Sequence, residues 1–233
     1  MNDALISLFT LTILEIVLGI DNIIFITILA GRVDKAKQSA ARNWGLILGM
    51  LVRILMLMGI NWIQKQEHPI FSAAGHDFSG KDILLILGGL FLVYQSVHEI
   101  HIKMKGEPLE KQERGKAKGW TAVMLQMVVI NVVFSLDSVI TAVGMADHLW
   151  VMITAVILSM GVMLLASKPI AGFVNDNPSV KVLALAFLVL IGVSLLGEGF
   201  DQEVNKGYIY FSMAFAFTIE MINLRIDKIN SKK

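Results

Sequence analysis

Residues 15–25 read EIVLGIDNIIF, in which two carboxylates interrupt a run of residues that is otherwise suited to lipid. No lysine or arginine lies on the same predicted helix, which covers residues 4–30. An acidic side chain at the middle of a bilayer costs about 2.5–3.5 kcal/mol on insertion scales. Glu15 and Asp21 therefore need a partner from another helix, or they serve a function.

The composition is that of a membrane protein. Of the 233 residues, 55% are hydrophobic and 17% are charged, and the mean hydropathy is +0.68, whereas soluble domains carry about 25% charged residues. The charges are clustered and leave long apolar runs, and a run of roughly 18 or more such residues is a candidate membrane span. We expect an all-α polytopic membrane protein that forms one domain over residues 1–233, surrounded by the lipid bilayer.

Charge and cysteine content exclude several other classes. The formal net charge is +1, and the basic residues lie in loops between the predicted spans, so no nucleic-acid partner is expected. The chain has no cysteine, which excludes disulfides, thiolate zinc sites and iron–sulfur clusters.

Polar or glycine-bearing segments divide the chain into seven predicted spans. They lie near residues 4–30, 43–64, 82–102, 120–145, 149–167, 180–199 and 207–224. The first would be about 40 Å long as a straight helix, which exceeds a hydrocarbon core of about 30 Å. We expect it to be tilted or broken, with Gly19 beside Asp21 as the point of the break.

Lysine and arginine alternate between the two ends of the predicted spans. They gather in the first loop, in the linker at 103–119 and in the C-terminal tail, and they are sparse in the intervening segments. Because short cytoplasmic loops carry an excess of these residues, we expect the N-terminus outside and the C-terminus inside a bacterial-type inner or plasma membrane. The first span lacks the basic region of a signal peptide and is predicted to be retained.

The segment after the linker repeats the opening of the chain. EIVLGIDNIIFIT at 15–27 aligns with NVVFSLDSVITAV at 131–143. The alignment pairs three polar positions: Glu15 with Asn131, Asp21 with Asp137, and Asn22 with Ser138.

Each copy of the repeat contains three spans, so the second copy enters the membrane from the opposite side. We therefore expect two inverted three-helix repeats and a seventh helix, with the linker between the repeats in the cytoplasm. Their ranges are about 4–102, 120–199 and 207–224. Inverted repeats are typical of secondary transporters, whose sites lie near the midplane where the repeats meet.

Such a site would gather carboxylate, amide and hydroxyl oxygens. An all-oxygen set suits hard divalent ions such as manganese, calcium or magnesium, and not copper(I). The candidate ligands are Asp21, Asp137, Glu15, Asn22, Asn131, Ser138, Glu99 and Glu198. A proton that replaces the departing metal would couple transport to the proton gradient.

The alternative is that the buried acids are paired with basic residues or are protonated. Arg53 and Lys168 are candidate counter-charges or gates, because cations do not ligate metal. His98 is a candidate proton relay, a ligand, or an interfacial histidine near the inner loop. Glu220 and Asn223 lie in the last span, outside the repeat.

Several ordered motifs resemble the TerC family of integral membrane proteins over nearly the whole chain. They are ExxxGxDN at 15–22, NxxFSLDS at 131–138, AGFV at 171–174, and EGF followed by KGYIYFSMAF at 198–215. The resemblance implies seven spans and membership of the lysine-exporter superfamily. It also implies export of Mn²⁺, or of Ca²⁺ in some members, an association with tellurium resistance, and intramembrane acids at Asp21 and Asp137. Lys168 departs from the arginine expected there.

Other functions fit the residues less well. An intramembrane aspartyl protease also uses two aspartates, but the chain has no PAL tripeptide and no GxGD motif, so we expect no enzyme. A retinal protein would need a lysine in the seventh predicted span, which has none. Two alternatives stay open: a non-transporting component of a tellurium-stress, metal-stress or membrane-protein assembly complex, and a small-solute exporter. We expect the metal ion to be transported and not held as a permanent cofactor, and an oligomer is compatible with the sequence.

Overall fold

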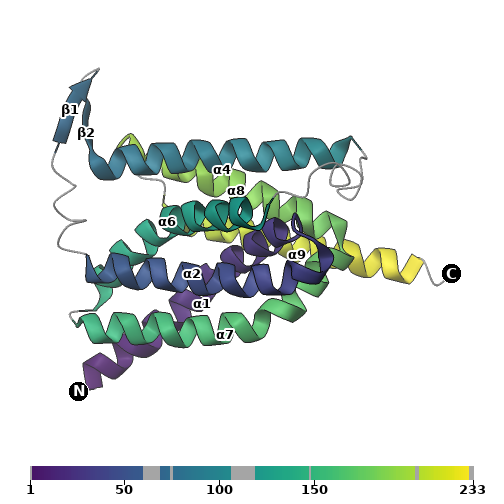
Figure 1. The fold of residues 1–233 in the computed structure, drawn as a ribbon, viewed down its shortest axis with the longest axis horizontal. Coiled ribbons are helices and arrows are strands. Elements are labelled where there is room, and N and C mark those ends of the chain that lie inside the picture. Colours follow the sequence, from purple (N-terminus) through teal and green to yellow (C-terminus); the bar gives the residue numbers. More distant parts are fainter. Residues whose placement is uncertain are drawn as a thin grey trace.

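The computed structural model describes residues 2–59, 69–73, 76–105, 119–146, 148–202 and 205–230. The elements are, in chain order, α1 (Asn2–Ala30), η1 (Lys35–Lys37), α2 (Gln38–Met58), β1 (Pro69–Ala73), β2 (His76–Ser79), α4 (Gly80–Met104), α6 (Trp120–Met145), α7 (Leu149–Asp176), α8 (Pro178–Gly199) and α9 (Lys206–Asn230). The helices form an elongated bundle with the two chain ends at opposite ends of it (Figure 1).

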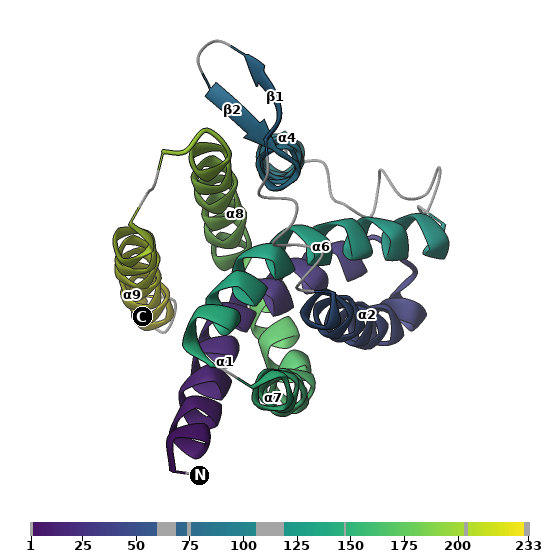
Figure 2. The same ribbon diagram turned by 90° about the vertical axis from the view of Figure 1, so that its left-hand side faces the viewer.

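Within this bundle, α1 and α6 occupy the middle. Figure 2, which looks along most of the helices, shows α4 and α8 side by side, α9 outside α8, and α2 and α7 on the other side of the central pair. The main helix pairs are α1 with α7, α2 with α6 and α4 with α8. Helices from the two halves of the chain are therefore interleaved.

Apolar side chains fill the inside of the bundle and also cover much of its outside. Leu11, Phe25 and Met127 are among the large side chains that are fully buried. Phe9 and Leu165, by contrast, are largely exposed. Exposed apolar side chains are costly in water but not in lipid. Six of the described helices are long and apolar enough to cross a membrane, and α6 contains a shorter apolar stretch, Trp120–Leu136. These findings confirm the prediction of a helical polytopic membrane protein.

Local sequence explains where two of the helices begin. The Ser79 hydroxyl and the Asp82 carboxylate cap the start of α4 reciprocally, with Asp82 N donating to Ser79 Oγ over 3.2 Å and Ser79 N to Asp82 Oδ2 over 2.8 Å. Such a capping box satisfies amides that have no partner within the helix. Pro178 begins α8, where a proline's missing N–H is not needed.

Four details of the predicted elements differ from the structure: the break of the first span at Gly19, the end of the fifth span, the absence of strands, and the start of the second span. α1 is continuous through Gly19, which serves packing instead, because a Cβ there would lie 2.2 Å from the Met163 sulfur. α7 does not end near residue 167 but continues through Pro169 to Asp176. The chain is not wholly helical, because β1 and β2 form an antiparallel hairpin. α2 begins at Gln38, five residues before the predicted start; its predicted C-terminal part, residues 60–64, lies outside the described residues.

Glycines allow α4 and α8 to approach closely. A Cβ at Gly89 would lie 2.6 Å from the Gly192 carbonyl oxygen, and a Cβ at Gly192 would lie 2.9 Å from the Gly89 carbonyl oxygen. In lipid, where apolar burial does not drive helix association, such small residues permit the backbone contact that holds helices together.

We expect Gly89→Ala to lower the stability of the protein. The new methyl group meets backbone that cannot move aside, and overpacking of this kind costs about 1–3 kcal/mol. The measurement is thermal unfolding of the detergent-solubilised protein. Gly161→Ala on α7 is the matched control, since nothing lies within 4 Å of a Cβ there. An equal effect of the two substitutions would contradict the close-contact account.

Candidate ion-binding cavity

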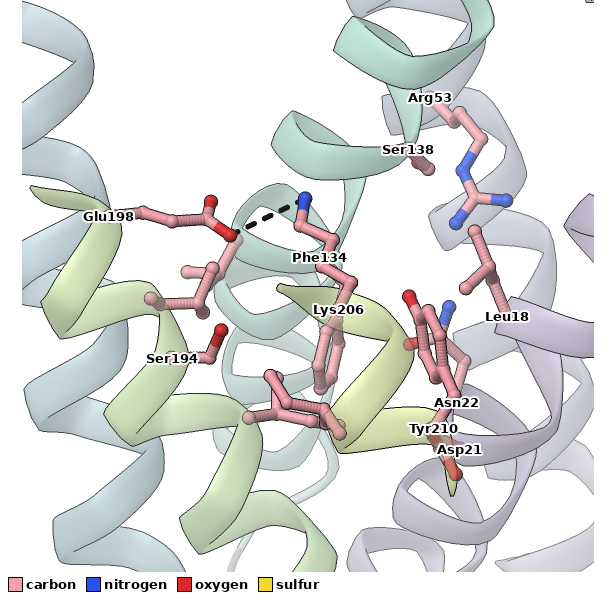
Figure 3. Close-up of a pocket in the computed structure, with 14 residues that line it drawn as sticks. Leu18, Asp21, Asn22, Arg53, Phe134, Ser138, Ser194, Glu198, Lys206 and Tyr210 are labelled. Carbon is pink, nitrogen blue, oxygen red and sulfur yellow. Dashed lines mark ion pairs between the residues drawn. The ribbon is translucent and has the colours of Figure 1, made fainter. Parts of the chain in front are cut away.

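A cavity lies where α1, α2, α6, α8 and α9 meet (Figure 3). Its volume is about 70 Å³, enough for several water-sized molecules. Its lining combines polar and apolar side chains: Leu18, Asp21, Asn22, Arg53, Val133, Phe134, Ser138, Ile191, Ser194, Leu195, Glu198, Lys206, Ile209 and Tyr210. Three of the predicted ligands on the first and fourth predicted spans, Asp21, Asn22 and Ser138, therefore face one space.

Asp21 is the distinctive acid of this cavity. Its side chain is half-buried, and no lysine, arginine or hydrogen-bond donor of the described residues pairs with it. Figure 3 shows the Asp21 and Asn22 side chains on the same side of the cavity as the Arg53 guanidinium, with Glu198 opposite. A carboxylate without a protein partner, facing a space inside a membrane protein, is suited to a cation.

Arg53 lines the cavity, but its guanidinium group is paired with the Glu15 carboxylate. The Arg53 Nη1 donates to Glu15 Oε2 in an ion pair between α2 and α1. Both residues are almost fully buried, with relative exposures of 4% and 3%. Glu15 is not among the described residues that line the cavity. Arg53 therefore neutralises Glu15, which is the counter-charge role that the sequence suggested for Arg53.

Glu198 and Lys206 form a second ion pair at the cavity. Lys206 Nζ lies 3.4 Å from Glu198 Oε1, and the dashed line in Figure 3 marks this pair. Glu198 lies in the last turn of α8 and Lys206 begins α9, so the pair spans the connection between these helices. Both side chains are partly exposed, which places them at the rim of the cavity.

The three predicted ligands on α6, Asn131, Asp137 and Ser138, have different surroundings. Asn131 Nδ2 donates to the Gly45 carbonyl oxygen over 3.2 Å, and Asn131 packs against Gly49, so it joins α6 to α2. Ser138 donates to the Ser135 carbonyl oxygen over 3.2 Å. Asp137 belongs to α6, but its side chain lies outside the part of the chain that the structure describes.

Five further residues named from the sequence are not among the described residues that line the cavity. Glu99 is buried and forms an ion pair with Arg32. His98 is exposed and stacks on Tyr94 with ring centroids 5.9 Å apart. Lys168 is exposed on α7. Glu220 is half-buried and Asn223 exposed on α9, and neither is among the described lining residues.

Sequence reasoning missed Ser194, Lys206 and Tyr210 as cavity residues. Lys206 and Tyr210 are four residues apart, so they share a face of α9, and Glu198 precedes them in the chain. That spacing could have been noticed, but nothing in the sequence says that α9 closes the cavity. Among the described residues, no group of three or more His, Asp or Glu side chains is placed to hold a metal ion.

The fold and the cavity define a polytopic membrane protein with a charged internal space. The sequence model of the family described as "Integral membrane protein TerC family" matches residues 1–233, and the chain belongs to this family. The resemblance seen in the sequence is thereby confirmed.

Named relatives cover the chain almost completely. A "UPF0053 protein" of Haemophilus influenzae is 49% identical over 227 residues, covering 97% of this chain and 96% of the relative. "UPF0053 inner membrane protein YgdQ" of Escherichia coli (strain K12) is 43% identical over 228 residues, covering 98% and 95%. "UPF0053 inner membrane protein YoaE" of the same strain is 44% identical over 220 residues, which are 93% of this chain but 42% of that relative. No solved structure matches the chain.

We expect Arg53→Met to destabilise the protein by about 3–5 kcal/mol, because it leaves the buried Glu15 carboxylate without a partner. The double variant Glu15→Gln/Arg53→Met removes both charges and should recover much of that loss. Thermal unfolding of the solubilised protein measures both. If the double variant were as unstable as the single one, the ion pair would not be the reason for the loss.

Proposed function

We propose that this protein is a secondary transporter that exports a divalent metal cation, with Mn²⁺ as the first candidate, through the cavity at Asp21. The observation that carries the proposal is the contrast among the acids that the sequence offers as candidate ligands. Within the described chain, Glu15, Glu99 and Glu198 each have a basic partner, whereas Asp21 faces the cavity without one. A transported cation would supply the missing charge.

The chemistry of the lining favours a hard cation. Asp21 offers a carboxylate, Asn22 an amide oxygen, and Ser138 and Ser194 hydroxyl oxygens. Oxygen ligands select Mn²⁺, Ca²⁺ and Mg²⁺ over softer metals. A site with few fixed carboxylates binds weakly enough to release its ion, as a transporter requires.

The helix pairs support an inverted repeat as the basis of transport. Suppose that a two-fold axis exchanges α1 with α6 and α2 with α7. The contact between α1 and α7 then requires a matching contact between α6 and α2, and the structure contains both. The same axis would exchange α4 with α8, which are in contact with each other. It would also relate the contact between α1 and α8 to the contact between α6 and α4, and both of these contacts are present. On this proposal Asp137 approaches the depth of Asp21 from the second repeat.

We expect Asp21→Asn to reduce Mn²⁺ export by roughly tenfold or more, since loss even of groups that only support a metal ligand costs 10–100-fold. Asp137→Asn should act similarly. Mn²⁺ flux into proteoliposomes that contain the purified protein is the measurement. Asp176→Asn is the matched control, because this aspartate is exposed at the end of α7.

Equal flux through wild type and Asp21→Asn would defeat the assignment of the cavity. No flux of Mn²⁺, Ca²⁺ or Mg²⁺ through well-folded wild type would defeat the transport function. The second result would favour the assembly-complex role that the sequence left open.

We further expect Mn²⁺ export to be driven by protons that move in the opposite direction. When the metal leaves, a proton can neutralise the Asp21 carboxylate at lower cost than leaving it charged within the membrane. A proton gradient imposed across the proteoliposome membrane should accelerate the flux, and an uncoupler should remove the acceleration. A flux that ignores the gradient would rule out proton exchange and leave metal export standing.

A further inference from the structure

A second buried polar cluster lies apart from the cavity, and we call it the arginine ring. Its members are Arg32, from the turn after α1; Gln95 and Glu99, from α4; and Gln126, from α6. Arg32 and Glu99 are 8% and 7% exposed. The cluster joins the two halves of the chain at one end of the bundle.

The hydrogen bonds of the arginine ring form a closed circuit. Arg32 Nη2 donates to Glu99 Oε1, and Arg32 Nη1 donates to Gln126 Oε1 over 3.0 Å. Gln126 Nε2 donates to Gln95 Oε1 over 2.8 Å, and Gln95 Nε2 donates to Glu99 Oε1 over 3.3 Å. A guanidinium cation is thus held by a carboxylate and an amide oxygen inside the protein.

The oxygens that hold Arg32 are the kinds that hold a hard metal ion. Carboxylate and amide oxygens bind Ca²⁺, Mg²⁺ and Mn²⁺. A further oxygen is close in sequence: the Ser96 hydroxyl is fully buried, has no hydrogen-bond partner among the described residues, and precedes Glu99 by three positions on α4. Residues at that spacing share a helix face.

Arg32 is placed so that its side chain can leave without breaking a helix. It lies in the turn between α1 and η1, and not in α1 itself. The side-chain amide of Gln38, at the start of α2, donates to the carbonyl oxygens of Gly31 and Val33 over 3.3 and 3.2 Å. These two hydrogen bonds hold the turn in place. The backbone of Arg32 is therefore held by contacts that do not involve its side chain.

The ring lies beyond the C-terminal end of α1, and the cavity lies farther back along the same helix. Asp21 is nine residues before Ala30, the last residue of α1, which is about 14 Å along the helix. Between them, Ile24 and Phe25 of α1 meet Ala184, Phe187 and Leu188 of α8 around a space of only about 10 Å³ beside Asp21. Apolar side chains of α1 and α8 therefore pack next to Asp21 on the side of the ring. The ring lies at a different depth, at the end that the basic residues assign to the cytoplasm.

We propose that the arginine ring is a second cation site, the cytoplasmic entry site for the metal, and that Arg32 occupies it whenever no metal is bound. This inference rests on the proposed function. An arriving divalent ion takes the oxygens of Glu99, Gln95 and Gln126, and the guanidinium moves out. With a single carboxylate the site binds its ion weakly, as entry requires.

The test uses the binding of MnCl₂ to the purified full-length chain in detergent, measured as the rise in melting temperature. All variants carry Asp21→Asn, so that the cavity contributes least. Adding Arg32→Gln should open the ring and create a Mn²⁺-dependent rise of roughly 3 °C or more that the Asp21→Asn protein lacks. Adding Glu99→Gln as well should abolish it.

Arg225→Gln in the same background is the matched control, because Arg225 is exposed on α9. If Mn²⁺ does not raise the melting temperature of the Arg32→Gln variant, the ring only holds the helices together and the inference fails. If Arg32→Gln does not fold, Arg32→Lys keeps the charge but holds the oxygens less firmly. It should lower the Mn²⁺ concentration for half-maximal stabilisation, and an unchanged concentration would overturn the inference.

These measurements need no transport, so they separate the two proposals. Loss of flux in Asp21→Asn tests the cavity, and the Mn²⁺ response of the Arg32 variants tests the ring. Metal binding at the ring without metal flux would keep the second site and reject the transporter.

Discussion

The cost of holding an ionised group inside a bilayer governs how this protein is built. The described acids near the cavity and at the ring meet that cost by pairing across elements: Glu15 with Arg53, Glu99 with Arg32, and Glu198 with Lys206. Each pair joins two segments of the bundle, so the charges also fix which segments are neighbours. Asp21 is the exception among them, and its position beside the cavity makes the exception informative.

Ion pairs of this kind specify an arrangement more than they stabilise it. Desolvation offsets most of the attraction between two buried charges, so the net gain in free energy is small. What holds the helices together in lipid is close packing, shown by Gly89 against Gly192 and by Gly19 against Met163. The pairs then select the one packed arrangement in which no charge is left without a partner.

Hydropathy predicted the helical bundle, because the bilayer imposes length and apolarity on every span. It could not predict that α7 passes through Pro169, since neighbouring helices decide whether a proline ends a helix. The cavity residues Asp21, Asn22 and Ser138 were found from the repeat. Arg53 was named as a candidate counter-charge, but the sequence did not say which acid it meets, because 38 residues separate it from Glu15. Arg32 was not named as the partner of Glu99, which lies 67 residues away, and only packing brings the two together. The alternative of paired acids, stated from the sequence, fits Glu15.

On the proposed function, helix α1 carries Asp21 and leads into the turn that bears Arg32, and this limits how the protein can move. A movement of the C-terminal part of α1 would shift both residues. A tilt of α1 that separates Ile24 and Phe25 from Leu188 would open this apolar packing and displace Arg32 from Glu99 in the same motion. Glu15 of α1 is paired with Arg53 of α2, and this pair would resist such a tilt. On the proposed function, the binding of a cation at Asp21 or at the ring would have to offset the loss of this buried ion pair before α1 could tilt.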